Sequence, residues 1–214
     1  MRKVYLQPHD IFYAERMAHL ISAPEVREPL GLTVNETSIA AMLDFIREMQ
    51  LEEMMGNHYS RMIMNEDFEL IGVITLHNID ELHRSSHIST WIAKDYWGLG
   101  YNTLAKEKIL LHAFTEMKLD VVFAGARVEN FRSRKAQRKL PYMTMNAQIQ
   151  YPEELQVLER REQAFCILNA VKSQDFLNWY DEKLLYKLNL SMKEFGLPVA
   201  WFSENQQWVA YNKA

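Results

Sequence analysis

The sequence predicts a single α/β domain followed by a C-terminal extension. The chain has 214 residues, the size of one domain or of one domain with an addition. Hydrophobic residues make up 48% and charged residues 24%, values typical of a globular protein. Strand-like and helix-like segments alternate up to residue 172, and one long amphipathic segment follows. We expect residues 1–172 to form the domain and residues 173–214 to pack on it or to lie at a dimer interface.

The first third of the chain predicts two helices and a hairpin. A helix is expected over 10–21 with Asp10 as its N-cap, and a second over 37–50, where apolar residues recur at helical spacing. The proline- and glycine-containing stretch 24–33 between them predicts a loop. Strands at 58–64 and 70–76 flank the turn-forming triplet Asn65-Glu66-Asp67, which indicates a β-hairpin.

The remaining elements follow the same logic. Residues 87–92 predict a strand, 103–118 a helix, 121–128 a buried strand, 131–140 a short basic helix and 163–171 the last core strand. In the extension, the spacing of Leu177, Leu184 and Leu188 predicts an amphipathic helix over 173–195. Gly196 stands where a helix C-terminal glycine belongs, and Pro198 lies just beyond it. The aromatic-rich end, 199–211, indicates a terminal hairpin around Ser203-Glu204-Asn205.

Composition excludes several classes of protein. The single cysteine, Cys166, rules out an internal disulfide and a cysteine-cluster zinc site, and the histidines lack the spacing of metal ligands, so we expect no metal. The net charge of −4 argues against nucleic acid as a partner. The apolar stretches are too short to span a bilayer, and the N-terminus lacks a signal-peptide core. We therefore expect a reduced cytoplasmic protein with no membrane partner.

A strand, a tight turn and a helix carry the chemistry. Gly98 and Gly100 directly precede the helix expected from Thr103, where unpaired amides and the helix dipole favour an anion such as phosphate. The turn is not a dinucleotide motif, which needs a third glycine at 103, nor a nucleoside-triphosphate loop, which needs a lysine after its second glycine. Glycine spacing alone leaves a plain strand-to-helix turn as an alternative.

Longer motifs indicate a family. The run Tyr96-Trp-Gly-Leu-Gly-Tyr-Asn-Thr-Leu-Ala105 resembles the acetyl-CoA loop of the GNAT superfamily of N-acetyltransferases. It is most similar to the subfamily that acetylates the N-termini of ribosomal proteins. Residues 24–31, 70–80 and 129–133 resemble the substrate loop, the third strand and the Glu-Asn-x-x-Ser motif of that family, in order. The resemblance covers roughly residues 3–145.

The resemblance implies the acyl-CoA N-acyltransferase fold: a mixed, mostly antiparallel sheet of about seven strands with helices on both faces. It implies acetyl-CoA as co-substrate and direct transfer to an amine acceptor. The pantetheine arm is expected along the fourth strand, the diphosphate on the turn, and the arm's far side near the fifth strand. The residues assigned to these contacts are Trp91, Ile92, Ala93, Trp97, Gly98, Leu99, Gly100, Tyr101, Asn102, Thr103, Asn130 and Ser133.

The proton acceptor is open between two histidines. An alkylammonium has no lone pair at neutral pH, so a base must take its proton. His87 aligns with a fourth-strand glutamate that serves as base in some relatives, and His77 at the end of the third strand is the second candidate; a half-buried structural histidine is the alternative for both. Many family members place a thiolate-protonating tyrosine where this chain has Gln137, so no tyrosine acid is carried over.

Departures from the family motif, and the positive charge of residues 131–140, leave alternative functions open. Asn102, Leu104 and Gln137 depart from the family pattern, so a catalytically weak or silent acetyl-CoA-binding module is the alternative to an active enzyme. The basic helix 131–140 is a solvated face, a contact to the 3′-phosphate of coenzyme A, or an RNA-binding surface. Acceptor candidates are a protein N-terminus, a polyamine and an aminoglycoside-like amine, of which the first is favoured by subfamily analogy alone.

Overall fold

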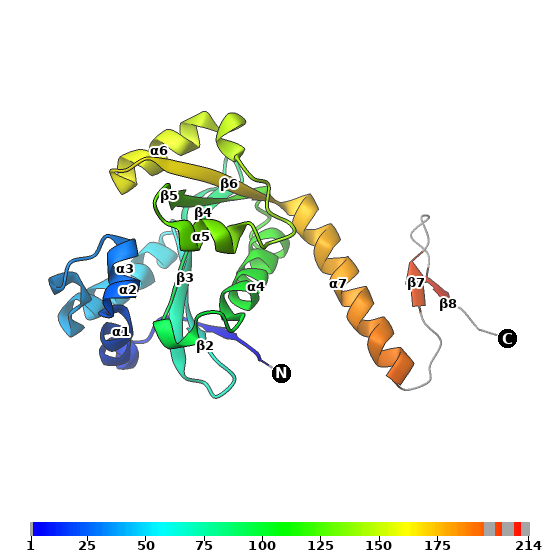
Figure 1. The fold of residues 1–214 in the computed structure, drawn as a ribbon, viewed down its shortest axis with the longest axis horizontal. Helices are drawn as coiled ribbons and strands as arrows, with labels where there is room; N and C mark the ends of the chain where they lie inside the picture. The colour runs from blue at the N-terminus through cyan, green and yellow to red at the C-terminus, as the bar shows by residue number, and fades with distance from the viewer. Residues whose placement is uncertain (1, 195–199, 203–207, 211–214) are drawn as a thin grey trace. The chain divides into compact units, whose positions relative to one another are not determined.

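The computed structural model describes residues 2–194, 200–202 and 208–210. The chain divides into two compact units, Met1–Ser173 and Gln174–Ala214, and each is described by itself. The first unit holds a six-stranded sheet with helices on both faces (Figure 1).

The sheet of the first unit follows chain order from one edge to the other. Neighbouring strands are antiparallel except for β4 and β5, which are parallel because the chain crosses over between them through a helix. The strands are β1 (Tyr5–Gln7), β2 (Tyr59–Met64), β3 (Leu70–Asp80), β4 (Ser85–Ile92), β5 (Val121–Arg127) and β6 (Cys166–Lys172). The expected hairpin, fourth strand and fifth strand are therefore confirmed, with β3 longer than predicted.

The sheet has six strands rather than about seven. Beside the edge strand β6 a further segment pairs at one position, where Thr144 and Ala170 exchange backbone hydrogen bonds of 2.8 and 2.9 Å. Asn146 then adopts a left-handed backbone with φ 59°, which ends the extended run, and the 3₁₀ helix η5 (Ala147–Ile149) follows.

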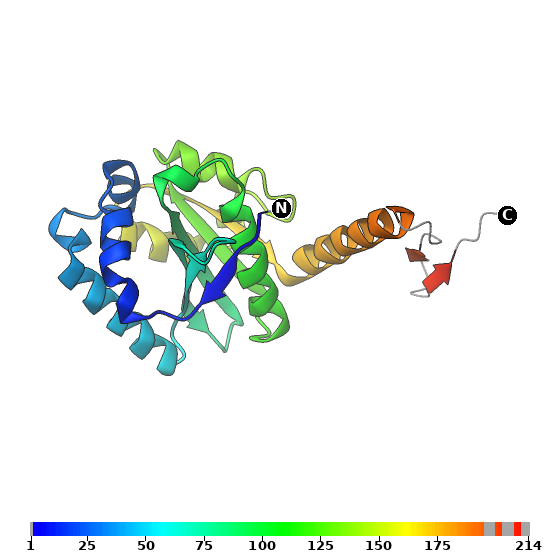
Figure 2. The same cartoon turned by 90° about the horizontal axis from the view of Figure 1, so that it is seen from below.

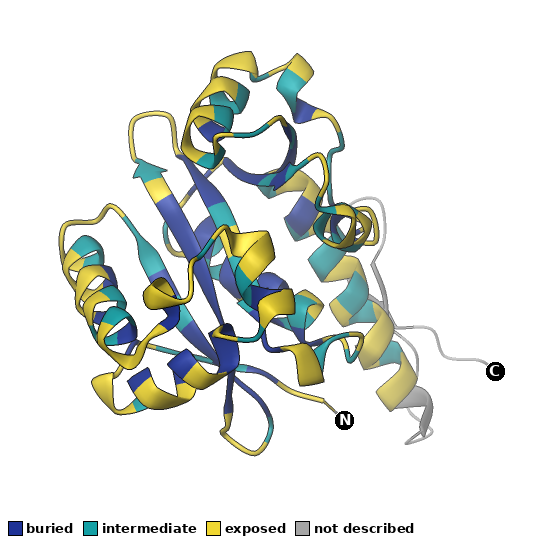
Figure 3. Cartoon of the chain, turned by 60° about the vertical axis from the view of Figure 1, so that its left-hand side comes forward, coloured by how far each residue is buried: buried dark blue, intermediate teal, exposed yellow. Residues whose placement is uncertain are grey.

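Helices cover both faces of this sheet (Figure 2). On one face, α1 (Ala14–Ile21) and α3 (Ile39–Met54) form an apolar cluster with the side chains of β2 and β3. On the other face lies α4 (Tyr101–Thr115), which buries Ala105, Ile109 and Ala113. Figure 3 shows the resulting pattern, with buried strands at the centre and helices whose outer surfaces are exposed. This packing fixes the strand that leads into the glycine turn.

Local capping explains where the first helices begin. The Asp10 side chain accepts a hydrogen bond from the amide of Phe12, and the expected helix there consists of η1 (Ile11–Tyr13) and α1. Ser38 caps α3 through the amide of Ala41. The loop expected over 24–33 is wrong: it contains α2 (Pro24–Arg27) and η2 (Glu28–Leu30), because proline at a first helical position favours a helical turn.

A longer helix of the first unit was also not predicted. The helix α6 (Pro152–Glu162) lies between η5 and β6, and it packs Leu158 into a cluster with Phe123 of β5 and Ala170 of β6. The short basic helix is α5 (Phe131–Gln137), which packs against β5. The predicted last core strand is present as β6, beginning at Cys166 rather than at 163.

The second unit contains α7 (Ser173–Glu194) and a two-stranded ribbon of β7 (Ala200–Phe202) and β8 (Trp208–Ala210). The expected helix and terminal strands are therefore present. Gly196, Pro198 and the turn around 203–205 lie outside the described residues. Among the described residues, no helix combines the length and the apolar character that crossing a bilayer requires.

Candidate active site

The site begins where two parallel strands separate. β4 and β5 pair only over Ser85–His87 and Val121–Phe123, and beyond these residues each strand stays paired with its outer neighbour alone. A cavity of about 580 Å³ opens along the split. It is lined by the free edges of both strands, by the glycine turn, by α5 and by the last turns of α6. His87 is the last paired residue of β4 and lies at the apex of this split.

The glycine turn forms one wall of the cavity. Gly98 and Gly100 have left-handed backbones, with φ 72° and 91°, and a Cβ built on either would meet nothing within 4 Å. The space around both glycines is therefore open. Gly100 is the N-cap of α4, and the amides of the following turn lack intrahelical partners. Asn102 and Thr103 of this turn line the same cavity, so the sequence places an anion-binding helix start against it.

Trp97 lies across the free edge of β4. Its indole Nε1 donates a hydrogen bond of 2.6 Å to the carbonyl of Ile92, and the Arg132 guanidinium lies 3.5 Å from the centre of its ring. The neighbouring Ala93 amide donates instead to Ile71 of β3. The carbonyl of Ile92 therefore faces the cavity, whereas Ala93 is committed to the sheet.

The structure brings together ten of the twelve residues expected to contact the cofactor. Ala93 and Leu99 do not line the cavity. The ten that do are Trp91, Ile92, Trp97, Gly98, Gly100, Tyr101, Asn102, Thr103, Asn130 and Ser133. Asn130 also caps α5, because its Oδ1 accepts a hydrogen bond of 3.0 Å from the amide of Ser133. From the predicted basic helix, Arg132, Lys135 and Lys139 face the cavity as well.

His87 forms a pair with a carboxylate from the unpredicted helix. Its Nε2 lies 2.8 Å from Oε2 of Glu154 in α6, and the His87 side chain is almost fully buried. A carboxylate only accepts hydrogen bonds, so Nε2 carries the proton and Nδ1 carries the lone pair. Burial lowers the pKa of His87 below its ordinary value, and Glu154 partly offsets that effect. The imidazole is thus neutral at physiological pH and held in one orientation.

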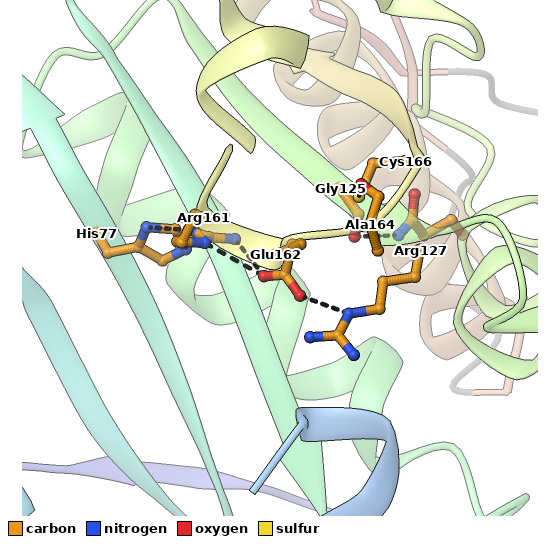
Figure 4. Close-up of polar contacts among 8 residues, drawn as sticks. His77, Gly125, Arg127, Arg161, Glu162, Ala164 and Cys166 are labelled. Carbon is orange, nitrogen blue, oxygen red and sulfur yellow. Dashed lines mark hydrogen bonds and ion pairs between the residues drawn. The ribbon is translucent and has the colours of Figure 1, made fainter. Parts of the chain in front are cut away.

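His77 lies directly across from His87 on β3, with the two rings stacked 5.6 Å apart. Nη1 of Arg161 lies 3.1 Å from Nδ1 and 3.2 Å from Nε2 of this ring, as Figure 4 shows. Burial, and then the positive charge of Arg161, lowers the pKa of His77 to about 2. An imidazole with so low a pKa stays neutral and is a very weak base, and His77 does not line the cavity, whereas His87 does.

A chain of charged groups extends from His77 along the end of α6. Arg161 pairs with Glu162, and Glu162 pairs with Arg127 of β5 at 3.0 Å (Figure 4). Burial, together with the nearby carboxylates, raises the pKa of Cys166 to about 11, so this thiol stays protonated. Among the described residues, no three His, Cys, Asp or Glu side chains are grouped to hold a metal ion.

Gln137 occupies the position of the family's tyrosine and serves the fold. Its Nε2 donates to the carbonyl of Gly125 at 3.2 Å and lies 3.3 Å from Oγ of Ser133. Its Oε1 accepts a hydrogen bond of 2.5 Å from Nδ2 of Asn169. An amide does not titrate, so this residue supplies no proton to a leaving thiolate.

Three residues of the site were missed by sequence reasoning: Glu154, Arg161 and Lys106. The first two belong to α6, whose start was signalled by Pro152 in its first turn and whose end was signalled by arginines in its last turn. Lys106 lies on α4, is 8% exposed and lines the cavity. Nothing in its local sequence distinguishes it from a solvated lysine.

Comparison with known proteins agrees with this geometry. Residues 3–142 match the family model described as Acetyltransferase (GNAT) domain. The chain is 33% identical over 143 residues to the protein named "Putative ribosomal N-acetyltransferase YdaF" of Bacillus subtilis (strain 168), covering 64% of this chain and 75% of that protein.

Solved structures share the fold at lower identity. Mycobacterium smegmatis RimJ in complex with CoA-disulfide has a TM-score of 0.63 at 20% identity, covering 80% of this chain and 83% of that one. Spermidine N-acetyltransferase from Vibrio cholerae, in complex with CoA and spermine, has a TM-score of 0.62 at 13% identity, covering 82% and 98%.

The fold and the family match together define an acyltransferase of the GNAT type. The chain belongs to the GNAT acetyltransferase family, since the family model covers well over half of it. It is accordingly an acetyl-CoA-dependent N-acetyltransferase, and its chemistry is acetyl transfer. The expected resemblance to the ribosomal-protein subfamily is confirmed by the Bacillus subtilis relative named above.

Proposed function

We propose that this enzyme transfers the acetyl group of acetyl-CoA to a primary amine, and that the amine is the N-terminus of a protein. The acceptor class is supported by a relative that is named "Putative ribosomal N-acetyltransferase YdaF". A polyamine is the alternative to be tested, because the spermidine enzyme shares the fold to a similar degree.

The residues of the cavity fit acetyl-CoA. The open amides that follow Gly98 and Gly100 suit its diphosphate, and the cavity-facing carbonyl of Ile92 suits an amide N–H of the pantetheine arm. Trp97 must release that carbonyl for the arm to use it. Asn130 and Ser133 approach the arm from α5. Acetyl-CoA supplies an acetyl group activated as a thioester, and the protein supplies the binding site and the proton acceptor.

His87 is the proposed general base, and one observation carries this assignment. The residue sits where β4 and β5 separate, and Glu154 fixes its tautomer so that the Nδ1 lone pair is available. As the acceptor nitrogen forms the N–acetyl bond, the C–S bond of the thioester breaks, coenzyme A leaves as its thiolate, and the nitrogen loses a proton. We propose that Nδ1 of His87 takes that proton and that Glu154 stabilises the resulting imidazolium.

The test measures thiol release from acetyl-CoA with a panel of amines. The panel contains peptides that begin with serine or alanine, the same peptides with a blocked N-terminus, spermidine and an aminoglycoside. We expect turnover with the free peptides alone, and a loss of roughly 100-fold or more in His87→Gln, the scale of a general base. Turnover with spermidine alone would replace the protein acceptor. Tight acetyl-CoA binding without turnover across a broad panel would favour the catalytically silent module.

A further inference from the structure

A buried lysine on α4 is unexplained by the proposed chemistry. Lys106 is 8% exposed, and among the described residues its Nζ forms neither a hydrogen bond nor an ion pair. Desolvation of an ammonium group without a partner is unfavourable. The group nevertheless lines the cavity at the split strands, so it can be paired by something that enters there.

The helix directs this lysine toward the glycine turn. Asn102 and Thr103 precede Lys106 by four and three residues, so all three share one face of α4, and all three line the cavity. Side chains on a helix lean toward its N-terminus, which here is Gly100. The positive end of the helix dipole and the ammonium group are therefore brought together, an arrangement that only an anion stabilises.

The rest of the lining is also cationic, although the chain as a whole carries a net charge of −4. Five further cations line the cavity against a single carboxylate, which is already paired with two of them. The charged lining residues from β5, α5, the segment just after α5, and α6 are Arg127, Arg132, Lys135, Lys139, Arg161 and Glu162, and the other titratable ones are His87, Tyr96 and Tyr101. This excess suits a ligand with several negative charges.

We propose that Lys106 binds the diphosphate of acetyl-CoA and completes the anion site formed by the first turn of α4. The inference rests on the proposed function, because it takes acetyl-CoA as the occupant of the cavity. The 3′-phosphate is the alternative anion. Lys106, however, lies on the same face of α4 as Asn102 and Thr103, next to the glycine turn, whereas Lys135 and Lys139 belong to α5 and the segment after it. The sulfur end of the cofactor is the other alternative.

Binding calorimetry separates these ends of the ligand. CoA, dephospho-CoA and pantetheine are titrated into the full chain and into Lys106→Met and Lys106→Arg at pH 7. Loss of one charge-assisted contact should weaken CoA and dephospho-CoA binding in Lys106→Met by roughly 10- to 100-fold, and leave pantetheine binding unchanged. A loss confined to CoA would assign Lys106 to the 3′-phosphate, and an equal loss for pantetheine would assign it to the sulfur end. Either outcome overturns the proposal.

Proton uptake provides a readout independent of activity. Burial lowers the pKa of Lys106 to about 8, so at pH 9 most of the free protein has a neutral amine there. A bound diphosphate raises that pKa, so wild type should take up a proton on binding CoA at pH 9, and Lys106→Arg should not. If wild type fails to bind CoA at all, the proposed function fails. If it binds CoA and Lys106→Met binds equally well, only this inference fails.

Discussion

Replacing Lys106 by methionine should stabilise the unliganded protein. The two side chains have similar length, so the substitution removes a charge without opening a large cavity. In the folded state the ammonium is desolvated and, among the described residues, unpaired, whereas in the unfolded chain it is solvated. A residue retained at a cost to stability is what a binding function predicts.

The size of the gain follows from the pKa. Burial lowers the pKa of Lys106 from 10.5 to about 8, and at ~1.4 kcal/mol per unit this corresponds to about 3 kcal/mol. The unfolded state binds the extra proton between those two values, so the free energy of unfolding of wild type rises with pH across that window. The penalty is complete below pH 8 and is gone above pH 10.5. The advantage of Lys106→Met should therefore be largest at pH 7 and shrink by pH 9.5.

Urea unfolding at pH 7 and pH 9.5 measures both effects, with circular dichroism to confirm the fold. Lys108→Met is the matched control, because Lys108 lies on the same helix but is exposed. Its removal should change the free energy of unfolding by no more than about 1 kcal/mol at either pH, the scale of an exposed cation–π contact. A Lys106→Met variant that is less stable than wild type, or whose gain is the same at both pH values, would refute the reasoning.

Three further changes test the site. Glu154→Gln removes the charge that raises the pKa of His87. The acidic limb of the pH profile of kcat/KM should therefore move to lower pH, and kcat should fall roughly 10-fold. An acidic limb at unchanged pH would leave Glu154 with a structural role. Gly100→Glu places a carboxylate on a left-handed backbone at the start of α4. That backbone strains any side chain, so the melting temperature should fall, and calorimetry at a temperature where the variant is folded should show CoA binding lost. Retained affinity would contradict the anion site. Gly72→Ala should lower the free energy of unfolding by roughly 2 kcal/mol or more, because its Cβ would overlap the carbonyl oxygen of Trp91, and urea titration checks this.

The cofactor side of the site could be predicted because it depends on local chain geometry. A strand, two glycines with left-handed backbones and a helix start form one contiguous segment, and contiguous motifs are visible in a sequence. The same reasoning predicted the strand that carries His87. It also placed Ala93 and Leu99 in the site, although Ala93 donates to β3 and Leu99 does not line the cavity, since sequence alone does not show which edge of a strand is free.

The part of the site that α6 forms could not be predicted, because the sequence of this helix shows almost no hydrophobic periodicity. It buries a single fully apolar side chain, Leu158, and its other positions are mostly charged. Its partner His87 lies 67 residues earlier, so the pair with Glu154 exists only after the sheet has formed. The short helix at Pro24 was missed for a related reason, since a proline marks both loops and helix starts.

Two buried basic side chains of one cavity, His87 and Lys106, differ in whether the protein supplies a carboxylate partner. Burial lowers the pKa of both His87 and Lys106, yet the protein offsets the effect only for His87, through Glu154. That choice suits a base, which must be neutral when the amine arrives and stabilised once it is protonated. Lys106 has the opposite requirement, because an anion-binding group must be charged when its ligand arrives and gains most if no protein carboxylate competes for it. On the proposal made above, the diphosphate of the cofactor provides the opposite charge that the protein does not provide for Lys106. The desolvated ammonium then lowers the stability of the empty enzyme, and the cofactor gains affinity by pairing with it.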